Sequence, residues 1–191
     1  MEDLIRKIKS RLHLSSKAEE FIYSISKEKT LPKGDVLIRQ GQVVKKTFFV
    51  TAGCLRSYCI DKNGKEHTLL FAIKDWWISD YIAIHSDELA TLTVECLTES
   101  TVIEFNAKEL DGIHARFPEF ESYQRHNLER HVVSLHKRIL NQLQLSATER
   151  YDLFLKQYPD IERHTRNYHI ASFLGITQES LSRIRVERAK K

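Results

Sequence analysis

Apolar positions near the end of the chain follow helical spacing twice, with one glycine between the two runs. Ile170 and Leu174 fall on one face of a first helix, and Leu181 and Ile184 fall on one face of a second. Gly175 suits the sharp turn between them, because glycine adopts left-handed backbone conformations without a Cβ clash. The pattern predicts a helix-turn-helix, for which the alternative is an ordinary helical hairpin with a solvated face.

The second of these helices would present its polar side, Ser182 included, to a DNA major groove. Thr177 is a favourable N-cap, and Glu179 lies in the first turn, where the helix dipole favours a carboxylate. We expect Arg183 to bind guanine O6 and N7, Glu179 to accept from cytosine N4, and Gln178 to contact an adenine or a variable base. The residues expected to contact phosphates are Thr177, Ser180, Arg185, Lys190 and Lys191.

Between Val36 and Phe105 the period changes to short runs rich in Val, Ile, Thr and aromatic residues. Turn formers separate these runs, and Asn63-Gly64 indicates a hairpin because both residues tolerate positive φ. Many short strands at close spacing predict an antiparallel jelly roll or barrel. The predicted strands are VLIRQG (36–41), KKTFFVTAG (45–53), CLRSYCID (54–61), EHTLLFAI (66–73), TLTVECLT (91–98) and STVIEFN (100–106).

Helical patterns lie on both sides of this β region. Residues 3–26 predict one or two amphipathic helices, the second capped by Ser15 or Ser16. A long helix follows the strands, with Pro118 near its start, and Ser146 begins a further helix that stops near Pro159. In the long helix, apolar residues at spacings of four, three, four and four form a row wide enough for a partner helix. This apolar row consists of Leu128, Val132, Leu135, Ile139 and Leu143.

The apolar row predicts a homodimer, because a helix-turn-helix commonly binds two half-sites as a symmetric pair. The alternative is a long helix that packs only on its own β region.

The composition describes a globular chain, with 191 residues of which 41% are hydrophobic and 29% charged. No apolar run approaches the ~20 residues of a membrane span, and the N-terminus lacks the apolar segment of a secretory signal. Cys54, Cys59 and Cys96 are too few and too widely spaced for a disulfide framework or a metal site. We therefore expect reduced thiols in the cytoplasm and no membrane partner.

Charge is concentrated at the end of the chain. Residues 161–191 hold seven Lys or Arg against three Glu, a difference of +4, and this equals the net charge of the whole chain. A local basic patch is typical of proteins that bind the phosphate backbone, although a basic tail also occurs as solubilising decoration.

The order of the predicted elements and four motifs resemble the catabolite-activator and fumarate/nitrate-regulator (Crp/Fnr) superfamily of bacterial transcription factors. The motifs are LPKGD at 31–35, the glycine at 41, FFVTAGCLR at 48–56 and IASFLGITQESLSRIR at 170–185. The recognition-helix pattern of the superfamily is matched by Thr177, Gln178, Glu179, Ser180 and Arg183. The resemblance covers nearly the whole chain. It implies a roll of the cyclic-nucleotide-binding type, a dimer through the long helix, and double-stranded DNA and RNA polymerase as partners.

The chain departs from the cyclic-nucleotide binders of this superfamily. Those proteins carry Gly-Glu for the ribose and an Arg followed by Ser or Thr for the cyclic phosphate. This chain has the sequence from Trp77 to Asp80 and Ala90-Thr91 at the matching positions. A buried phosphate without its arginine would be poorly paired, so cyclic AMP and cyclic GMP are not the expected effectors.

Iron–sulfur and haem sensing are not expected either. The oxygen-sensing branch needs an N-terminal cysteine cluster, and no cysteine precedes Cys54, while the roll offers only His67 and His85 as axial haem ligands. An unidentified small effector would occupy a pocket in the roll, unless the same residues are plain core and the roll is a scaffold. The residues expected to line such a pocket are Trp77, Ser79, Asp80, Tyr81, Thr91 and Thr93.

The sequence therefore predicts an α+β protein in three parts. These are an antiparallel β-roll with N-terminal helices (1–112), a dimerisation helix (113–143) and a helix-turn-helix (144–191). Only six residues follow Arg185, so we expect no β-hairpin wing. The predicted function is regulation of transcription through a palindromic operator. One alternative is a cupin-like metal enzyme, for which the histidine set is missing from residues 36–105; the other is a sensor that acts through protein partners without binding DNA.

Overall fold

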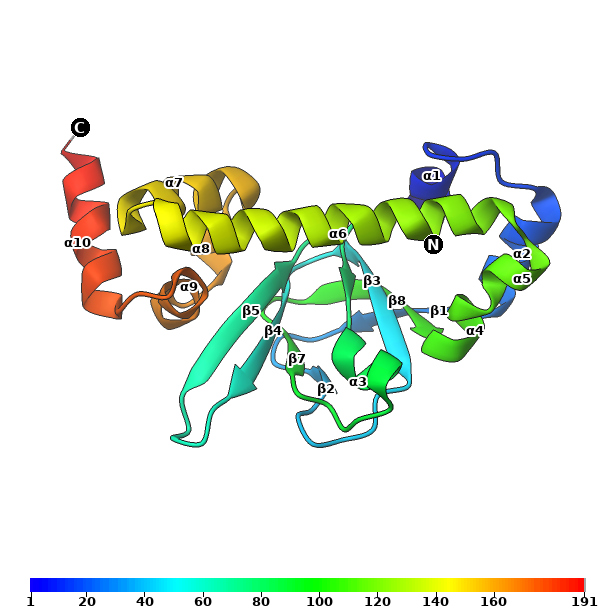
Figure 1. Cartoon of the computed structure of the whole chain (residues 1–191), viewed down its shortest axis with the longest axis horizontal. Coiled ribbons are helices and arrows are strands. Elements are labelled where there is room, and N and C mark those ends of the chain that lie inside the picture. The colour runs from blue at the N-terminus through cyan, green and yellow to red at the C-terminus, as the bar shows by residue number, and fades with distance from the viewer. Residues whose placement is uncertain (191) are drawn as a thin grey trace.

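The computed structural model describes residues 1–190 and, within them, every side chain except that of His114. In this range eight strands form two four-stranded sheets, with helices before and after them in the chain and one short helix between β6 and β7 (Figure 1). The strands are β1 (Ser26–Leu31), β2 (Val36–Ile38), β3 (Lys46–Ala52), β4 (Leu55–Ile60), β5 (Glu66–Ala72), β6 (Trp77–Ile78), β7 (Thr93–Cys96) and β8 (Ser100–Asn106). The helices are α1 (Glu2–Lys9), α2 (Ser16–Ser24), α3 (Tyr81–Ser86), α4 (Ala107–Asp111), α5 (Ile113–Arg116), α6 (Glu119–Gln144), α7 (Ala147–Gln157), α8 (Ile161–His164), α9 (Asn167–Leu174) and α10 (Gln178–Ala189).

The two sheets form the antiparallel roll that the sequence predicted. One has the order β1-β8-β3-β6 and the other the order β2-β7-β4-β5, so β5 is an edge strand. The hairpin between β4 and β5 turns at Asn63-Gly64, and Gly64 has a φ of 78°. The sequence predicted no strand at β1, which pairs with β8 along its whole length.

Two apolar clusters hold the roll and its flanking helices together. The first lies between the sheets and includes Phe48, Leu55 and Val94, all at most 2% exposed. The second joins the strands β3 and β8 to the helices α1, α2, α5 and α6, through residues such as Leu4 and Phe120. The N-terminal helices and the start of α6 are therefore part of the roll.

A third cluster joins the helix-turn-helix to the roll. Phe71 of β5 contacts three aromatic rings of the C-terminal helices, with ring centroids 5.8 Å from Phe154, 5.8 Å from Tyr158 and 5.3 Å from Phe173. Cys54 and Leu97 of the roll belong to the same cluster, as do Leu181 and Ile184 of α10. The helix-turn-helix thus shares its core with the β-roll.

Helix α6 spans most of the length of the molecule above the roll (Figure 1). The α1, α2, α4 and α5 helices gather at its N-terminal end, and α7 to α10 lie at the other end, with α10 steeply inclined to its axis. None of the helices in residues 1–190 is both long and apolar enough to cross a membrane.

Replacing Gly53 by alanine is expected to destabilise the fold by about 3 kcal/mol or more, because two costs add. Gly53 has a φ of +85°, and a Cβ placed on it would lie 2.3 Å from Ser100 Oγ and 2.4 Å from the Glu99 carbonyl oxygen. Gly41 has a φ of +84° with nothing near the added carbon, so Gly41→Ala isolates the backbone cost of about 1 kcal/mol. Urea unfolding of both variants measures the difference, and equal losses would contradict it.

Candidate nucleic-acid interface

The turn between α9 and α10 has the geometry that its glycine predicted. Gly175 ends α9 in the left-handed region with a φ of 69°, and its N–H donates to the Ser172 carbonyl at 3.2 Å. The Ile176 N–H then donates to the carbonyl of Ala171 at 3.0 Å. Thr177 is the N-cap of α10, since its hydroxyl accepts from the Ser180 N–H at 3.2 Å. Capping at both helix ends sets the angle between the helices.

One side of α10 is buried and the other carries exposed polar side chains. Leu181 and Ile184 are 0% and 7% exposed, because they pack in the aromatic cluster shared with the roll. The side chains of Gln178, Glu179, Ser182 and Arg183 are exposed, and Thr177 is exposed beside them. The structure therefore brings the predicted base-contacting residues onto one accessible face of one helix.

The polar side chains on this face of α10 make few hydrogen bonds within the chain. Arg183 donates one long hydrogen bond of 3.4 Å to Ser180 Oγ, and the Thr177 hydroxyl lies 3.2 Å from the same oxygen. Hydrogen bonds from its own backbone amide and from the Thr177 side chain lower the pKa of Glu179, so its carboxylate is an acceptor at neutral pH. Donors and acceptors are both available to a ligand here.

Arg185 differs from Arg183, because its guanidinium turns back into the domain. It lies 2.5 Å from Glu162 Oε1 and donates to Tyr151 Oη at 3.0 Å and to Asn167 Oδ1 at 2.5 Å. A phosphate contact by Arg185 stays a prediction. The structure adds a role that the sequence did not indicate, which is to tie α10 to the helices α7, α8 and α9.

Beneath the start of α9 lies a buried charged group that sequence analysis missed. Arg56 of β4 is 2% exposed and bonds Glu66 and Glu95 at 2.6 Å each, with its guanidinium 3.9 Å from the centre of the Tyr58 ring. His169 of α9 is 7% exposed, and its Nδ1 lies 3.9 Å from Glu66 Oε2 without a hydrogen-bond partner in the described chain. Burial, with the nearby Arg56 charge, lowers the pKa of His169 from 6.5 to about 4.

His169 is expected to make the stability of the protein fall as the pH drops from about 6.5 to about 4. In that pH range the His169 imidazole is protonated in the unfolded protein but stays neutral in the folded one. The reason is that burial and the positive charges of Arg56 and Arg166 outweigh the attraction by Glu66. At about 1.4 kcal/mol per pKa unit, the loss reaches about 2–3 kcal/mol near pH 4. Urea unfolding at a series of pH values, compared with His169→Gln, isolates this effect; identical pH dependence in both proteins would contradict it.

The apolar row of α6 faces solvent. Leu128, Val132, Leu135, Ile139 and Leu143 have exposed fractions of 64%, 40%, 38%, 53% and 77%. Val133 and Leu140 on the same helix are also about half exposed. So many large apolar side chains along one helix are unusual for a surface that stays in water. The dimer interface stays a prediction, and its residues are accessible to a partner.

The residues predicted to line an effector pocket make separate contacts within the roll, and the pocket itself stays a prediction. Trp77 packs against Phe49 and Phe105, in the cluster that faces the N-terminal helices. The Ser79 hydroxyl donates to the Lys46 carbonyl, and the Thr93 hydroxyl accepts from the Gln40 N–H. The Tyr81 ring lies over His85 and close to His131 of α6. Only Asp80 and Thr91 of the predicted set are joined directly, at 2.9 Å.

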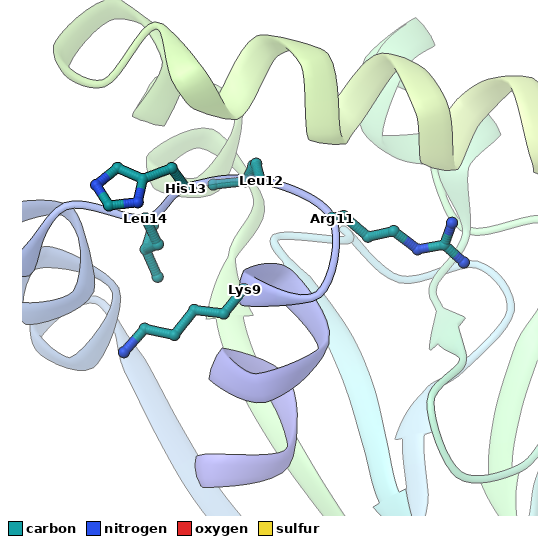
Figure 2. A pocket seen from close by; sticks show the side chains of 5 residues that line it. All are labelled: Lys9, Arg11, Leu12, His13 and Leu14. Atoms are coloured by element: carbon teal, nitrogen blue, oxygen red, sulfur yellow. The ribbon is translucent and has the colours of Figure 1, made fainter.

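Two surface depressions lie at the other end of the molecule, beside α1 and α2. The first, of about 660 Å³, is lined by Lys9, Arg11, Leu12, His13 and Leu14. Figure 2 shows that the side chains of Lys9 and Arg11 extend in opposite directions, and Lys9 is paired with Glu19 at 2.5 Å. The cations therefore do not converge on an anion. Within the described chain, no group of three or more His, Cys, Asp or Glu side chains is placed to hold a metal ion.

The comparisons with known proteins agree with this architecture. The family model of the cyclic nucleotide-binding domain matches residues 28–117. The transcriptional activator protein FnrA of Stutzerimonas stutzeri is 21% identical over 171 residues, which cover 84% of this chain and 69% of that protein. FixK2 from Bradyrhizobium japonicum has a TM-score of 0.73 at 16% identity, with 87% of this chain and 85% of that chain covered. A protein from Eubacterium rectale described as a regulator of the Crp/Fnr family has a TM-score of 0.72 at 18% identity, with coverage of 93% and 85%.

The order of a β-roll, a long helix and a C-terminal helix-turn-helix is the fold that this chain shares with these regulators. Residues 28–117 match the cyclic nucleotide-binding domain, and the chain as a whole is similar to regulators of the Crp/Fnr family. The resemblance inferred from the sequence motifs is thus confirmed.

The residues of this domain do not fit a cyclic nucleotide. Asp80 is 0% exposed at the start of α3, and its carboxylate accepts from the N–H groups of Ala83, Thr91 and Leu92 and from the Thr91 hydroxyl, at 2.7 to 3.1 Å. The donors that converge here are therefore taken by a carboxylate of the chain itself. A second anion beside the Asp80 carboxylate would be repelled.

Proposed function

We propose that this protein is a homodimeric, sequence-specific DNA-binding regulator of transcription. The observation that carries the proposal is the exposed polar face of α10, whose opposite side is buried and whose N-terminus is capped. A helix presented in this way fits a major groove, where side-chain donors and acceptors distinguish base pairs. Regulation of this kind would act on RNA polymerase at the promoter.

The base contacts are assigned to three side chains with matching chemistry. Arg183 provides two donors for guanine O6 and N7, Glu179 accepts from cytosine N4, and Gln178 bonds an adenine or a variable base. We assign phosphate contacts to Thr177, Ser180 and Lys190, which are on the surface or partly exposed. Such contacts set the position of the helix without identifying the sequence.

Dimerisation through α6 would bury its apolar row and present two recognition helices related by a two-fold axis. Such symmetry predicts a palindromic operator whose half-sites lie about one helical turn apart, at roughly 10–10.5 bp. The support for the dimer is the exposure of Leu128, Ile139 and Leu143 on a helix that otherwise packs on its own chain.

The effector, if the roll binds one, is not a cyclic nucleotide under this proposal. The Asp80 carboxylate is satisfied by four donors of the chain itself, among them the N–H and hydroxyl of Thr91, which lies at the position matched to the phosphate-binding pair. Isothermal titration of the purified protein with cyclic AMP and cyclic GMP is expected to show no binding. Binding in the micromolar range would contradict this part of the proposal.

Selection from a pool of random DNA duplexes tests the proposed function directly. The purified protein is expected to enrich a palindrome, and the logarithm of its affinity should fall linearly with the logarithm of the salt concentration. Enrichment of no sequence, or an affinity that is independent of salt, would contradict DNA binding by this protein.

A further inference from the structure

The free edge of β5 is occupied by side chains from outside the roll. β5 is the last strand of its sheet, so its outward N–H and C=O groups have no neighbouring strand. The pairing with β4 shifts between Ser57, which opposes Leu70, and Tyr58, which opposes Thr68. Leu69 is the extra residue of this bulge, and a bulge leaves backbone groups unpaired.

Two side chains of α9 replace part of the missing strand. The Tyr168 hydroxyl accepts from the Glu66 N–H at 3.1 Å. Ser172 Oγ accepts from the Thr68 N–H at 2.9 Å and donates to the Glu66 carbonyl at 2.9 Å. Ser172 thus forms both bonds that one residue of an adjoining parallel strand would supply.

Arg138 of α6 also forms hydrogen bonds with the free edge of β5. Its guanidinium donates to the carbonyl of Thr68 at 3.3 Å and to the carbonyl of Leu69 in the bulge. It also donates to the Phe173 carbonyl at 3.3 Å and lies 4.3 Å from the centre of the Phe173 ring. One side chain therefore joins the long helix, the edge strand and the last turn of α9.

We infer that Tyr168, Ser172 and Arg138, which we name the β5 latch, hold the helix-turn-helix on the roll and thereby set the separation of the two recognition helices in the dimer. The apolar cluster around Phe71 brings the surfaces together, but such contacts are non-directional. Hydrogen bonds to fixed backbone groups of β5 specify one position along the strand. The three residues act as positioning residues, and this inference rests on the proposed function for its DNA part.

Amide exchange tests the docking without DNA. The Glu66 and Thr68 amides of the full-length protein are expected to be protected, although they lie on an edge strand. Ser172→Ala should raise exchange at Thr68 at least about tenfold, while the central-strand amides of β7 remain unchanged. Ser24→Ala, which removes a hydroxyl that bonds only within α2, is the matched control. Unchanged exchange at Thr68 in Ser172→Ala would overturn the latch.

A spacer series tests the positioning. The probes are duplexes that carry the palindrome selected by the wild-type protein, with one or two base pairs added or removed at the centre. Wild-type affinity should fall steeply, by about tenfold or more for each change. In Ser172→Ala and Arg138→Ala, affinity for the parent duplex should fall about tenfold, and the penalty for altered spacing should shrink to about threefold or less.

The control for Arg138→Ala is Lys137→Ala, since Lys137 is an exposed cation on the same turn of α6. A steep spacing dependence in both latch variants would overturn the inferred positioning role. If the wild-type protein selects no duplex, the proposed function fails, and amide exchange alone still decides whether the latch exists.

Discussion

Ile139→Glu is expected to make the protein monomeric and to lower its affinity for a palindromic duplex by at least about 100-fold. Ile139 belongs to the apolar row of α6 and is 53% exposed. In a symmetric dimer the substitution would bury two carboxylates opposite apolar side chains, at a cost of several kcal/mol for each. Loss of the dimer also removes the gain from binding two half-sites together, which amounts to about 10²–10⁴ in affinity.

Sedimentation equilibrium and titration with whole and half palindromes measure these effects. Gln144→Glu is the matched control, because it adds a carboxylate at an exposed position on the same helix outside the apolar row. The Ile139→Glu variant should bind a half-site with the same affinity as the wild-type protein. A dimeric Ile139→Glu protein, or a monomeric wild type, would show that the apolar row is not the dimer interface.

Arg183→Ala is expected to cost about 1–3 kcal/mol of DNA binding for each half-site and to abolish discrimination at one base position. The reason is that Arg183 is exposed on the polar face of α10 and has only one long bond within the chain. Because nothing in the fold depends on that bond, the free energy of unfolding should remain unchanged. The measurement is a series of single base substitutions in the selected operator, with the stability of each variant followed by urea unfolding.

Arg185→Ala provides the contrast within the same helix. The substitution removes the contacts of Arg185 with Glu162, Tyr151 and Asn167, so we expect a lower stability of the protein. The pattern of base discrimination should be kept, since Arg185 points away from the exposed face. If both variants changed the base preference alike, the roles assigned to the two arginines would be wrong.

Local features of the C-terminal helices could be predicted because their causes are local. Glycine at 175 adopts the left-handed conformation, and the threonine at 177 caps the following helix, both through groups within a few residues. The spacing of Leu181 and Ile184 identified the buried side of α10 for the same reason. The predicted hairpin at Asn63-Gly64 is likewise a property of two residues.

Features that depend on distant partners could not be predicted in this way. β1 has the sequence SKEKTL, which is polar and a poor strand former, and it forms a strand because β8 supplies its hydrogen bonds. Trp77 packs in the cluster that faces the N-terminal helices, and β6 is only two residues long, too short for alternation to show which face each residue takes. The inward turn of Arg185 depends on Glu162 and Tyr151, and helical spacing within α10 contains no information about either.

One aromatic core joins the β-roll to the C-terminal helices, and it limits how these helices can be fused to other proteins. This core contains Phe71, Phe154, Tyr158 and Phe173. A C-terminal fragment cut at residue 144 would leave the aromatic faces that now meet β5 open to water. Chimaeras that graft these helices onto a foreign sensor would therefore need to carry a compatible edge strand with them.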